Sequence, residues 1–340
     1  MDAVLHNFFQ SQSLIILLLI ILVSFYTLSK GADILVDQAV SLSIRWGIPK
    51  MVIGATIVSL GTTLPEATVS VLAAINGNPD MALGNAIGSI ICDTGLIIGI
   101  SALIGTLPVD KKTIDRQGWV QIAAGILLAV IALPFRRTLE DGSSLHIIPQ
   151  WVGFLFLVLL AAYLFIMMKW SMNSGMDEGA LLEEEKSPVY LQLLKLVFGV
   201  FLVIFSSKVL IGSVEVTALK IGIPQAIIAA TLVAFGTSLP ELMTAVTSVR
   251  KGHGELAIGN IIGADILNVL FVVGASAAAT ANGLIVPLHF YYIQIPTMLI
   301  ILVLFRYFCK NTKDVINKKE GALLLGFYAI YLILNFTVKF

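Results

Sequence analysis

IGATIVSLGTTLPE at residues 53–66 is matched by IAATLVAFGTSLPE at residues 228–241. The two copies are offset by 175 residues and align without a gap. Each ends on a glutamate, Glu66 or Glu241, which follows a Gly-Thr pair and a proline inside an apolar stretch. An ionised side chain in such a stretch is energetically costly unless it is paired, so it is a candidate for a functional role. Two of them at equivalent positions predict the two halves of one cation site.

The composition indicates a membrane protein. Of the 340 residues, 58% are hydrophobic and 12% are charged, whereas soluble domains carry about 25% charged residues. The mean hydropathy is +0.96. The formal net charge is zero and the chain has no nucleic-acid-binding motif, so nucleic acid is excluded as a partner. Cys92 and Cys309 offer neither a zinc-ligand spacing nor a disulfide framework. We therefore expect a multi-pass protein embedded in a lipid bilayer.

Apolar segments long enough to cross that bilayer recur along the whole chain. A transmembrane helix needs about 20 residues. Residues 1–10 lack the basic region of a signal peptide, so the first apolar run is expected to remain as a span. The expected spans are 12–44, 50–76, 80–105, 118–134, 147–169, 189–219, 223–250, 255–280, 286–308 and 320–338.

These spans group into two halves, and the grouping predicts their relative orientation. Five spans fall in residues 1–169 and five in residues 189–340, joined by a linker at 170–188. Because five is odd, the second copy must start on the opposite side of the membrane. The expected fold is an all-α polytopic membrane protein with ten transmembrane helices in two inverted five-helix repeats. Transporters built in this way bind their ions near the midplane, between discontinuous helices.

Basic residues support one orientation of this topology. With both termini outside, most lysines and arginines fall on the inner side, as the positive-inside rule expects. The linker then lies in the cytoplasm. It is polar and acidic, and we interpret it as a solvated tether.

Each repeat is expected to break a helix just before its glutamate. Proline donates no backbone hydrogen bond, and its ring displaces the carbonyl four residues earlier. Those carbonyls belong to Gly61 before Pro65 and to Gly236 before Pro240. Freed carbonyls, nearby hydroxyls and a carboxylate are oxygen ligands, which hard cations prefer. For one copy alone, a plain proline kink with a paired glutamate would be a reasonable alternative; two matched copies favour the ion site.

The helix after each break adds polar side chains. Ser89 and Asp93 are four residues apart and share a helix face, one turn after Asn85. Facing helices would gather four side chains into a compact cluster: Glu66, Glu241, Asp93 and Asn268. Two or three negative charges with amide and hydroxyl oxygens suit Ca²⁺. The motifs contain none of the His ligands that would favour zinc or copper.

The paired motifs resemble a known family. Gly-Thr-[Ser/Thr]-Leu-Pro-Glu followed by Gly-Asn-x-x-Gly-[Ser/Ala] is similar to the α1 and α2 repeats of the Na⁺/Ca²⁺ exchanger branch of the cation/Ca²⁺ antiporter superfamily, in its small prokaryotic form. The likeness is motif-specific at residues 47–99 and 222–274. It implies a secondary antiporter in the plasma membrane that exchanges Ca²⁺ for Na⁺ by alternating access, as spans one and six slide across the others. It implies no enzyme activity, no cofactor and no protein partner.

The resemblance also implies an ion site. The two glutamates would bind both ions, the threonine after each glycine would offer its carbonyl, and the next hydroxyl would serve Na⁺. The implied residues are Glu66, Glu241, Thr62, Thr237, Thr63, Ser238, Ser89, Asp93 and Asn268.

The chain departs from the family pattern in its second repeat. Ala264 stands where a serine is usual, and Asp265 stands where an asparagine is common. The carboxylate at Asp93 and the amide at Asn268 also look exchanged relative to the better-known members of the family. We include Asp265 among the candidate metal-site residues; it either lines an access path for ions or pairs with a neighbour. A site with fewer hydroxyls could use a different number of Na⁺ ions or admit H⁺.

Three further functions stay open on these patterns. An H⁺/Ca²⁺ antiporter is the main rival, although related proton exchangers carry Gly-Asn-Ala-x-Glu in place of Gly-Thr-x-x-Pro-Glu. A cation channel would use similar oxygens along a continuous pore. An intramembrane acid protease would need two carboxylates but no matched proline breaks.

Overall fold

The computed structural model describes residues 2–133, 136–138, 144–172, 188–222, 235–311 and 314–337 of the chain. Two expected features fall outside these ranges: residues 223–234, which begin the seventh expected span, and residues 173–187, most of the linker.

Helices dominate both halves of the chain. The first half forms α1 Asp2–Ser11, α2 Leu14–Trp46, α3 Lys50–Ile53, the π-helical η1 Gly54–Val58, α4 Ser59–Thr62, α5 Leu64–Ile75, α6 Pro79–Cys92, η2 Asp93–Ile97, α7 Ile98–Ile104, α8 Lys111–Ala132 and α9 Gln150–Met172. The second forms α10 Val189–Lys220, α12 Leu239–Arg250, α13 Gly254–Leu267, η4 Asn268–Val273, α14 Gly274–Ala278, η5 Phe290–Gln294, α15 Ile295–Asn311 and α16 Lys318–Thr337.

Seven helices of the described ranges are long and apolar enough to cross a membrane, or up to eight if the bent pair Lys50–Thr62 with Leu64–Ile75 is counted as one span. The seven are Leu14–Trp46, Pro79–Ile104, Thr113–Ala132, Gln150–Trp170, Val189–Lys220, Gly254–Ala278 and Phe290–Asn311. Each coincides with an expected span. The protein is therefore a helical polytopic membrane protein, as the composition predicts.

Local sequence explains where the helices begin and end. The Ser13 side chain accepts a hydrogen bond from the Ile16 amide at the start of α2, and Gly47 ends that helix in a left-handed conformation with φ of 64°. This conformation is available to glycine without steric cost. At the start of α6, Asn78 Oδ1 accepts from the Met81 amide at 3.1 Å. Such caps satisfy amides that have no partner within the helix.

The structure confirms the expected break before each glutamate. In the first repeat the helix bends by 45°, and Thr63, with φ of −80° and ψ of −3°, separates α4 from α5. In the second, Ser238 has nearly the same conformation, with φ of −83° and ψ of 6°, and α12 begins at the next residue. Pro65 and Pro240 are the second residues of α5 and α12, within the first turn, where a backbone N–H would have no partner in the helix.

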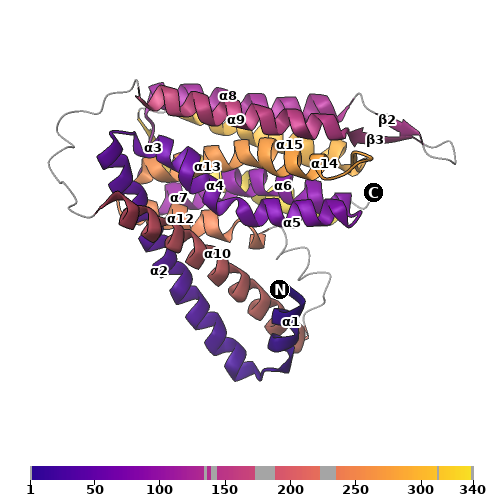
Figure 1. Ribbon diagram of the computed structural model, residues 1–340, viewed down its shortest axis with the longest axis horizontal. Helices are drawn as coiled ribbons and strands as arrows, with labels where there is room; N and C mark the ends of the chain where they lie inside the picture. The colour runs from indigo at the N-terminus through magenta and orange to yellow at the C-terminus, as the bar shows by residue number, and fades with distance from the viewer. Residues whose placement is uncertain are drawn as a thin grey trace.

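Two long helices project from the helical bundle. Figure 1 shows α2 and α10 packed along each other and leaning away from the other helices, with α1 near their far end. Small residues permit the close approach: a Cβ on Gly31 would lie 2.9 Å from Leu202 Cβ, and one on Gly199 would lie 2.9 Å from the Leu35 amide nitrogen. Such contacts are typical of helix pairs in lipid.

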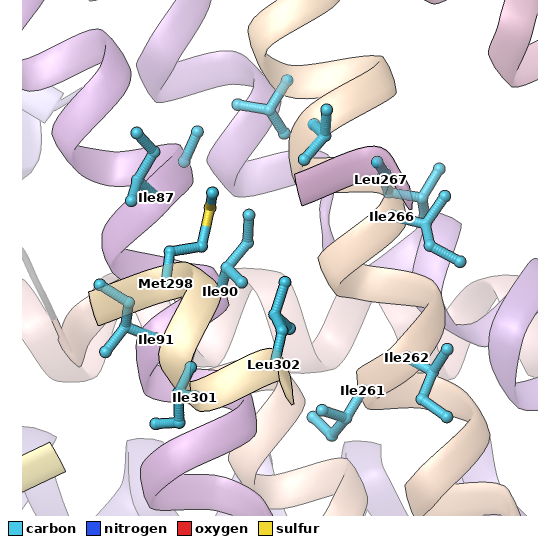
Figure 2. Close-up of a cluster of buried hydrophobic side chains, with 14 of the residues drawn as sticks. Ile87, Ile90, Ile91, Ile261, Ile262, Ile266, Leu267, Met298, Ile301 and Leu302 are labelled. Atoms are coloured by element: carbon cyan, nitrogen blue, oxygen red, sulfur yellow. The ribbon is translucent and has the colours of Figure 1, made fainter. Parts of the chain in front are cut away.

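Much of the interior of the bundle is an apolar cluster to which both halves of the chain contribute side chains. Figure 2 shows isoleucines of α6 and α13 facing side chains of α15, among them Met298 and Leu302. At the glycines of α13, backbone meets backbone. A Cβ on Gly259 would collide with the Met51 carbonyl, and one on Gly263 would lie 2.5 Å from the Ala55 carbonyl oxygen. Gly259 and Gly263 therefore serve close helix packing.

Short strands, which the hydropathy pattern does not predict, join the connecting segments. β1 Leu107–Pro108 pairs antiparallel with β5 Val315–Ile316. β3 Ser144–Ile148 lies between β2 Arg136–Thr138 and β4 Leu284–Val286, with Arg136 opposite His146 and His146 opposite Val286. Both sheets connect segments from different halves of the chain.

Candidate ion-binding site

Glu66 and Glu241 lie at equivalent, fully buried positions. Each occupies the first turn of the helix that follows a break, α5 or α12, and each is 1% exposed. The N-terminus of a helix favours negative charge at this position. Among the described residues, all four carboxylate oxygens lack a hydrogen-bond partner. Buried carboxylate oxygens of this kind are costly unless a bound cation or a proton compensates their lost hydration.

The hydroxyls at each break face acids of the opposite repeat. Thr62 and Thr63 lie close to the Glu241 carboxylate, and Thr237 lies close to that of Glu66. No hydrogen bond of normal geometry joins these pairs within the described residues, since the carboxylate oxygens remain unpartnered. The reciprocal arrangement brings both breaks to one place.

Direct hydrogen bonds also cross between the repeats. Ser238 Oγ donates to Ser89 Oγ at 3.3 Å, and Thr237 Oγ1 donates to Asn85 Oδ1 at 2.9 Å. In the converse direction, Thr62 Oγ1 donates to Asn260 Oδ1 at 3.5 Å. The helices that follow each glutamate therefore contact the break of the other repeat.

Asn85 and Asn260 also belong to the arrangement, although neither is among the ligands predicted from the motifs. Besides accepting from Thr237, Asn85 donates through Nδ2 to the Glu66 carbonyl at 3.2 Å and to Ser70 Oγ at 3.0 Å. It thus fixes the break of one repeat to the glutamate of the other. The sequence carries a signal for both residues, because each copy contains Gly-Asn-x-x-Gly.

Asp93 and Asn268 open two π-helical segments, η2 and η4, and both are 1% exposed. Asp93 is within electrostatic range of Glu241 and Glu66. Neither of its carboxylate oxygens, nor Asn268 Oδ1, has a hydrogen-bond partner in the described part of the chain. η4 packs against α5 and α6, the helices of Glu66 and Ser89.

Asp265 has different neighbours. It is 2% exposed on α13, and its Oδ2 accepts from Thr94 Oγ1 at 2.6 Å and from Gln121 Nε2 at 2.5 Å. Of the two roles left open above, this geometry corresponds to pairing with neighbours. Its carboxylate still lies within electrostatic range of Asp93.

The chemistry of the central cluster is that of a hard cation site with mixed ligands. It combines three buried carboxylates, Glu66, Glu241 and Asp93, with amide and hydroxyl oxygens. In the described ranges, no three acidic, histidine or cysteine side chains are close enough to hold a metal by themselves. Hydroxyl, amide and backbone oxygens would have to complete the coordination, which the flexible geometry of Ca²⁺ permits.

A polytopic helical fold with helix breaks beside buried carboxylates defines a membrane transporter of cations. The sequence model of the family described as sodium/calcium exchanger protein matches residues 16–169 and 191–337, so the chain belongs to that family. It is a transporter rather than an enzyme, and it exchanges Ca²⁺ for Na⁺.

Several known proteins are similar over nearly the whole chain. The sodium/calcium exchanger MaX1 of Methanosarcina acetivorans is 29% identical in an alignment 357 residues long, gaps included, which covers 94% of this chain and 98% of that protein. The inner membrane protein YrbG of Escherichia coli is 32% identical over 309 residues, covering 89% and 91%. The solved structure of the sodium-calcium exchanger NCX_Mj soaked with Na⁺ and Sr²⁺ superposes with a TM-score of 0.78 at 27% identity, covering 96% of this chain and 100% of that one.

Proposed function

We propose that the exchanged ions compete for one central site between the two helix breaks. The observation that carries the proposal is the set of unpartnered, buried carboxylate oxygens on Glu66 and Glu241. The proposed ligands are the side chains or carbonyls of Glu66, Glu241, Thr62, Thr237, Thr63, Ser238, Ser89, Asp93 and Asn268. Asp265 is excluded from this set because Thr94 and Gln121 hold its carboxylate.

Competition at shared oxygens would explain why exchange is obligatory. One Ca²⁺ or several Na⁺ neutralise the cluster, and only the neutralised site can change its exposure from one side to the other. Moving uncompensated charge through hydrocarbon is costly. We assign the movement to α2 and α10, because they pack mainly on each other and lean out from the bundle (Figure 1).

For the finer architecture we propose ten transmembrane helices in two inverted repeats, 1–169 and 189–340, with 170–188 as a cytoplasmic linker and both termini outside. α12 and α16, which are not among the long apolar helices described above, would supply the two remaining spans. In support, Lys50 contacts His253 and Lys251 contacts Asp37, so two lysines that the proposed topology places on the inner side lie close to the same turn between α12 and α13. Single cysteines at residues 3 and 180, labelled in intact cells with a membrane-impermeant reagent, test the topology: residue 3 should react and residue 180 should not.

The exchange itself is tested in proteoliposomes. ⁴⁵Ca²⁺ uptake should follow an outward Na⁺ gradient and should not follow a pH gradient alone. Glu66→Gln and Glu241→Gln should each reduce uptake to the level of empty vesicles. Glu320→Gln is the matched control, because Glu320 also lies in the first turn of a helix, α16, but is only half-buried, and its carboxylate accepts a hydrogen bond from the Asn317 amide. Normal uptake by either buried variant would refute the central site, and uptake driven by pH alone would refute its Na⁺ assignment.

A further inference from the structure

A buried carboxylate beside the central site has no role in the exchange mechanism described above. Asp265 on α13 is held by Thr94 of η2 and Gln121 of α8, so three separate helical segments meet at this side chain. Within the described ranges it forms no ion pair with Lys, Arg or His. A charge buried without a cation is expensive in a membrane interior.

The hydrogen bonds leave oxygens unsatisfied at this position. Both donors reach the same oxygen, Oδ2, whereas Asp265 Oδ1 and Gln121 Oε1 have no partner among the residues that the structure describes. Gln121 is 1% exposed, so bulk water does not compensate the loss. One turn earlier on α8, the fully buried Gln117 has no partner for either amide atom within the same ranges. Residues four apart share a helix face, so Gln117 extends the same polar strip.

We propose that Asp265, Thr94 and Gln121 bind one Na⁺ at a second site, separate from the central one. The unpartnered atoms at Asp265 and Gln121 are acceptors, which a bound cation would satisfy. One carboxylate with neutral hydroxyl and amide oxygens balances a single positive charge. A divalent ion would leave an excess charge in a dry interior, which is costly. Oxygen-only ligands suit a hard cation such as Na⁺.

An ion at this position would also affect the central site. Asp93 lies within electrostatic range of Asp265, and the two carboxylates repel each other. Na⁺ bound at Asp265 offsets that repulsion and joins α8, η2 and α13. The second site belongs to the bundle, whereas the exchanged ions depend on the helix breaks, so saturating Ca²⁺ should displace Na⁺ from the central site only.

This difference gives the experiment. Equilibrium ²²Na⁺ binding is measured on the purified full chain in detergent, with saturating Ca²⁺ present. The wild-type protein should retain one Na⁺ per chain, whereas Asp265→Asn should retain none, and Thr94→Val and Gln121→Leu should bind it at least tenfold more weakly. Thr94→Ser keeps the hydroxyl and should retain the ion. ⁴⁵Ca²⁺ binding in the same samples reports the central site independently.

Gln38→Leu is the matched control for a lost buried glutamine. Gln38 is buried on α2, and its Oε1 also lacks a partner in the described residues. This variant should keep both the residual Na⁺ and Ca²⁺ binding. If Asp265→Asn does not fold, the Na⁺ binding of the Thr94→Val and Gln121→Leu variants tests the proposal instead. A wild-type protein without residual Na⁺, the result expected if Asp265 carries only a proton, would overturn the proposal. An unchanged Na⁺ count in all three variants would overturn it as well. Failure of Ca²⁺ binding with retained Na⁺ would instead count against the central site.

Discussion

Asp93 and Asn268 occupy equivalent positions in the two repeats, yet only one of them carries a charge. Each begins a π-helical segment, is 1% exposed and has an unpartnered oxygen within the described part of the chain. The backbone of the site therefore keeps the symmetry of the repeats while its charge does not. The third carboxylate belongs to the first repeat, and its position should influence how strongly the site attracts Ca²⁺.

Exchanging the two side chains tests this asymmetry. Asp93→Asn removes one negative charge and should weaken Ca²⁺ uptake by roughly tenfold, corresponding to about 1.4 kcal/mol. The double variant Asp93→Asn with Asn268→Asp restores the charge on the opposite repeat and should recover most of the loss. ⁴⁵Ca²⁺ uptake at a fixed Na⁺ gradient measures both. A double variant no better than the single one would show that the charge must lie on the first repeat.

His253 is expected to make stability depend on pH. It lies outside the membrane-spanning segments, and burial together with the positive charge of Lys50 lowers the pKa of His253 below its ordinary value. Lys50 Nζ lies 3.2 Å from His253 Nδ1; Glu255, Asp37 and Lys251 complete the charged surroundings.

The sign of the effect follows from proton binding. The unfolded chain takes up the proton first as pH falls below about 6.5, so folding stability should decrease from there until the lowered pKa of the folded state is reached. Thermal unfolding in detergent between pH 7.5 and 5 measures this loss. His253→Gln should flatten part of it. An identical pH profile for the wild type and His253→Gln would contradict the assignment.

At the scale of residues, the sequence is informative where two copies can be compared. The matched offset identifies both glutamates and the hydroxyls beside them, because an acid that recurs in apolar sequence is rarely retained without a function. Asn85 and Asn260 are recognisable in both copies but are not among the predicted ligands, since their contacts with Thr237 and Thr62 depend on how the repeats interlock. Gln121 gives no signal at all, because a single glutamine on an apolar helix has no motif.

At the scale of elements, apolar length and proline predict most of the helices. The breaks at Thr63 and Ser238 occur where Pro65 and Pro240 require them. The π segments η1, η2 and η4 are not predicted, because an extra residue in a turn reflects packing by neighbouring helices rather than local propensity. Two of these segments begin at Asp93 and Asn268, so the unpredicted geometry coincides with the candidate ion site.

The contact between α2 and α10 should be sensitive to side-chain volume. Gly199→Leu would push a side chain into the Leu35 backbone, and overpacking of this kind costs about 1–3 kcal/mol. We expect a lower thermal unfolding temperature in detergent and slower ⁴⁵Ca²⁺ uptake. Gly326→Leu on α16 is the control, since a Cβ there meets no atom within 4 Å. If both variants behave like the wild type, the close packing of α2 on α10 is not needed for stability or transport.

At the scale of the whole molecule, the two halves of the chain make more contacts with each other than a simple tandem repeat would suggest. The short sheets pair β1 with β5 and β3 with β4, each across the halves. Strands of two to five residues in connecting segments leave almost no pattern in a sequence. They form because backbone groups near the membrane ends need partners, and only the assembled helices bring those segments together.

Obligatory exchange is a property of the whole molecule. Vesicles loaded with ⁴⁵Ca²⁺ should release it into buffers containing Na⁺ or unlabelled Ca²⁺, and release into choline buffer should be at least tenfold slower. The reason is the energetic cost of moving the empty, negatively charged cluster through hydrocarbon. Efflux is followed by filtration, with protein-free vesicles as the control. Equal release into choline buffer would indicate a channel-like pathway instead.

The backbone contact between α13 and the segment Lys50–Val58 has a consequence for biosynthesis. Gly259 and Gly263 in the second half rest directly on Met51 and Ala55 in the first, so neither half can complete its own interior before the other is inserted. If the chain is divided at residue 180 and produced as two polypeptides, the fragments should be degraded when made separately and should reassemble when made together. During synthesis, the first half would then complete its folding only after the helices of the second half have been inserted.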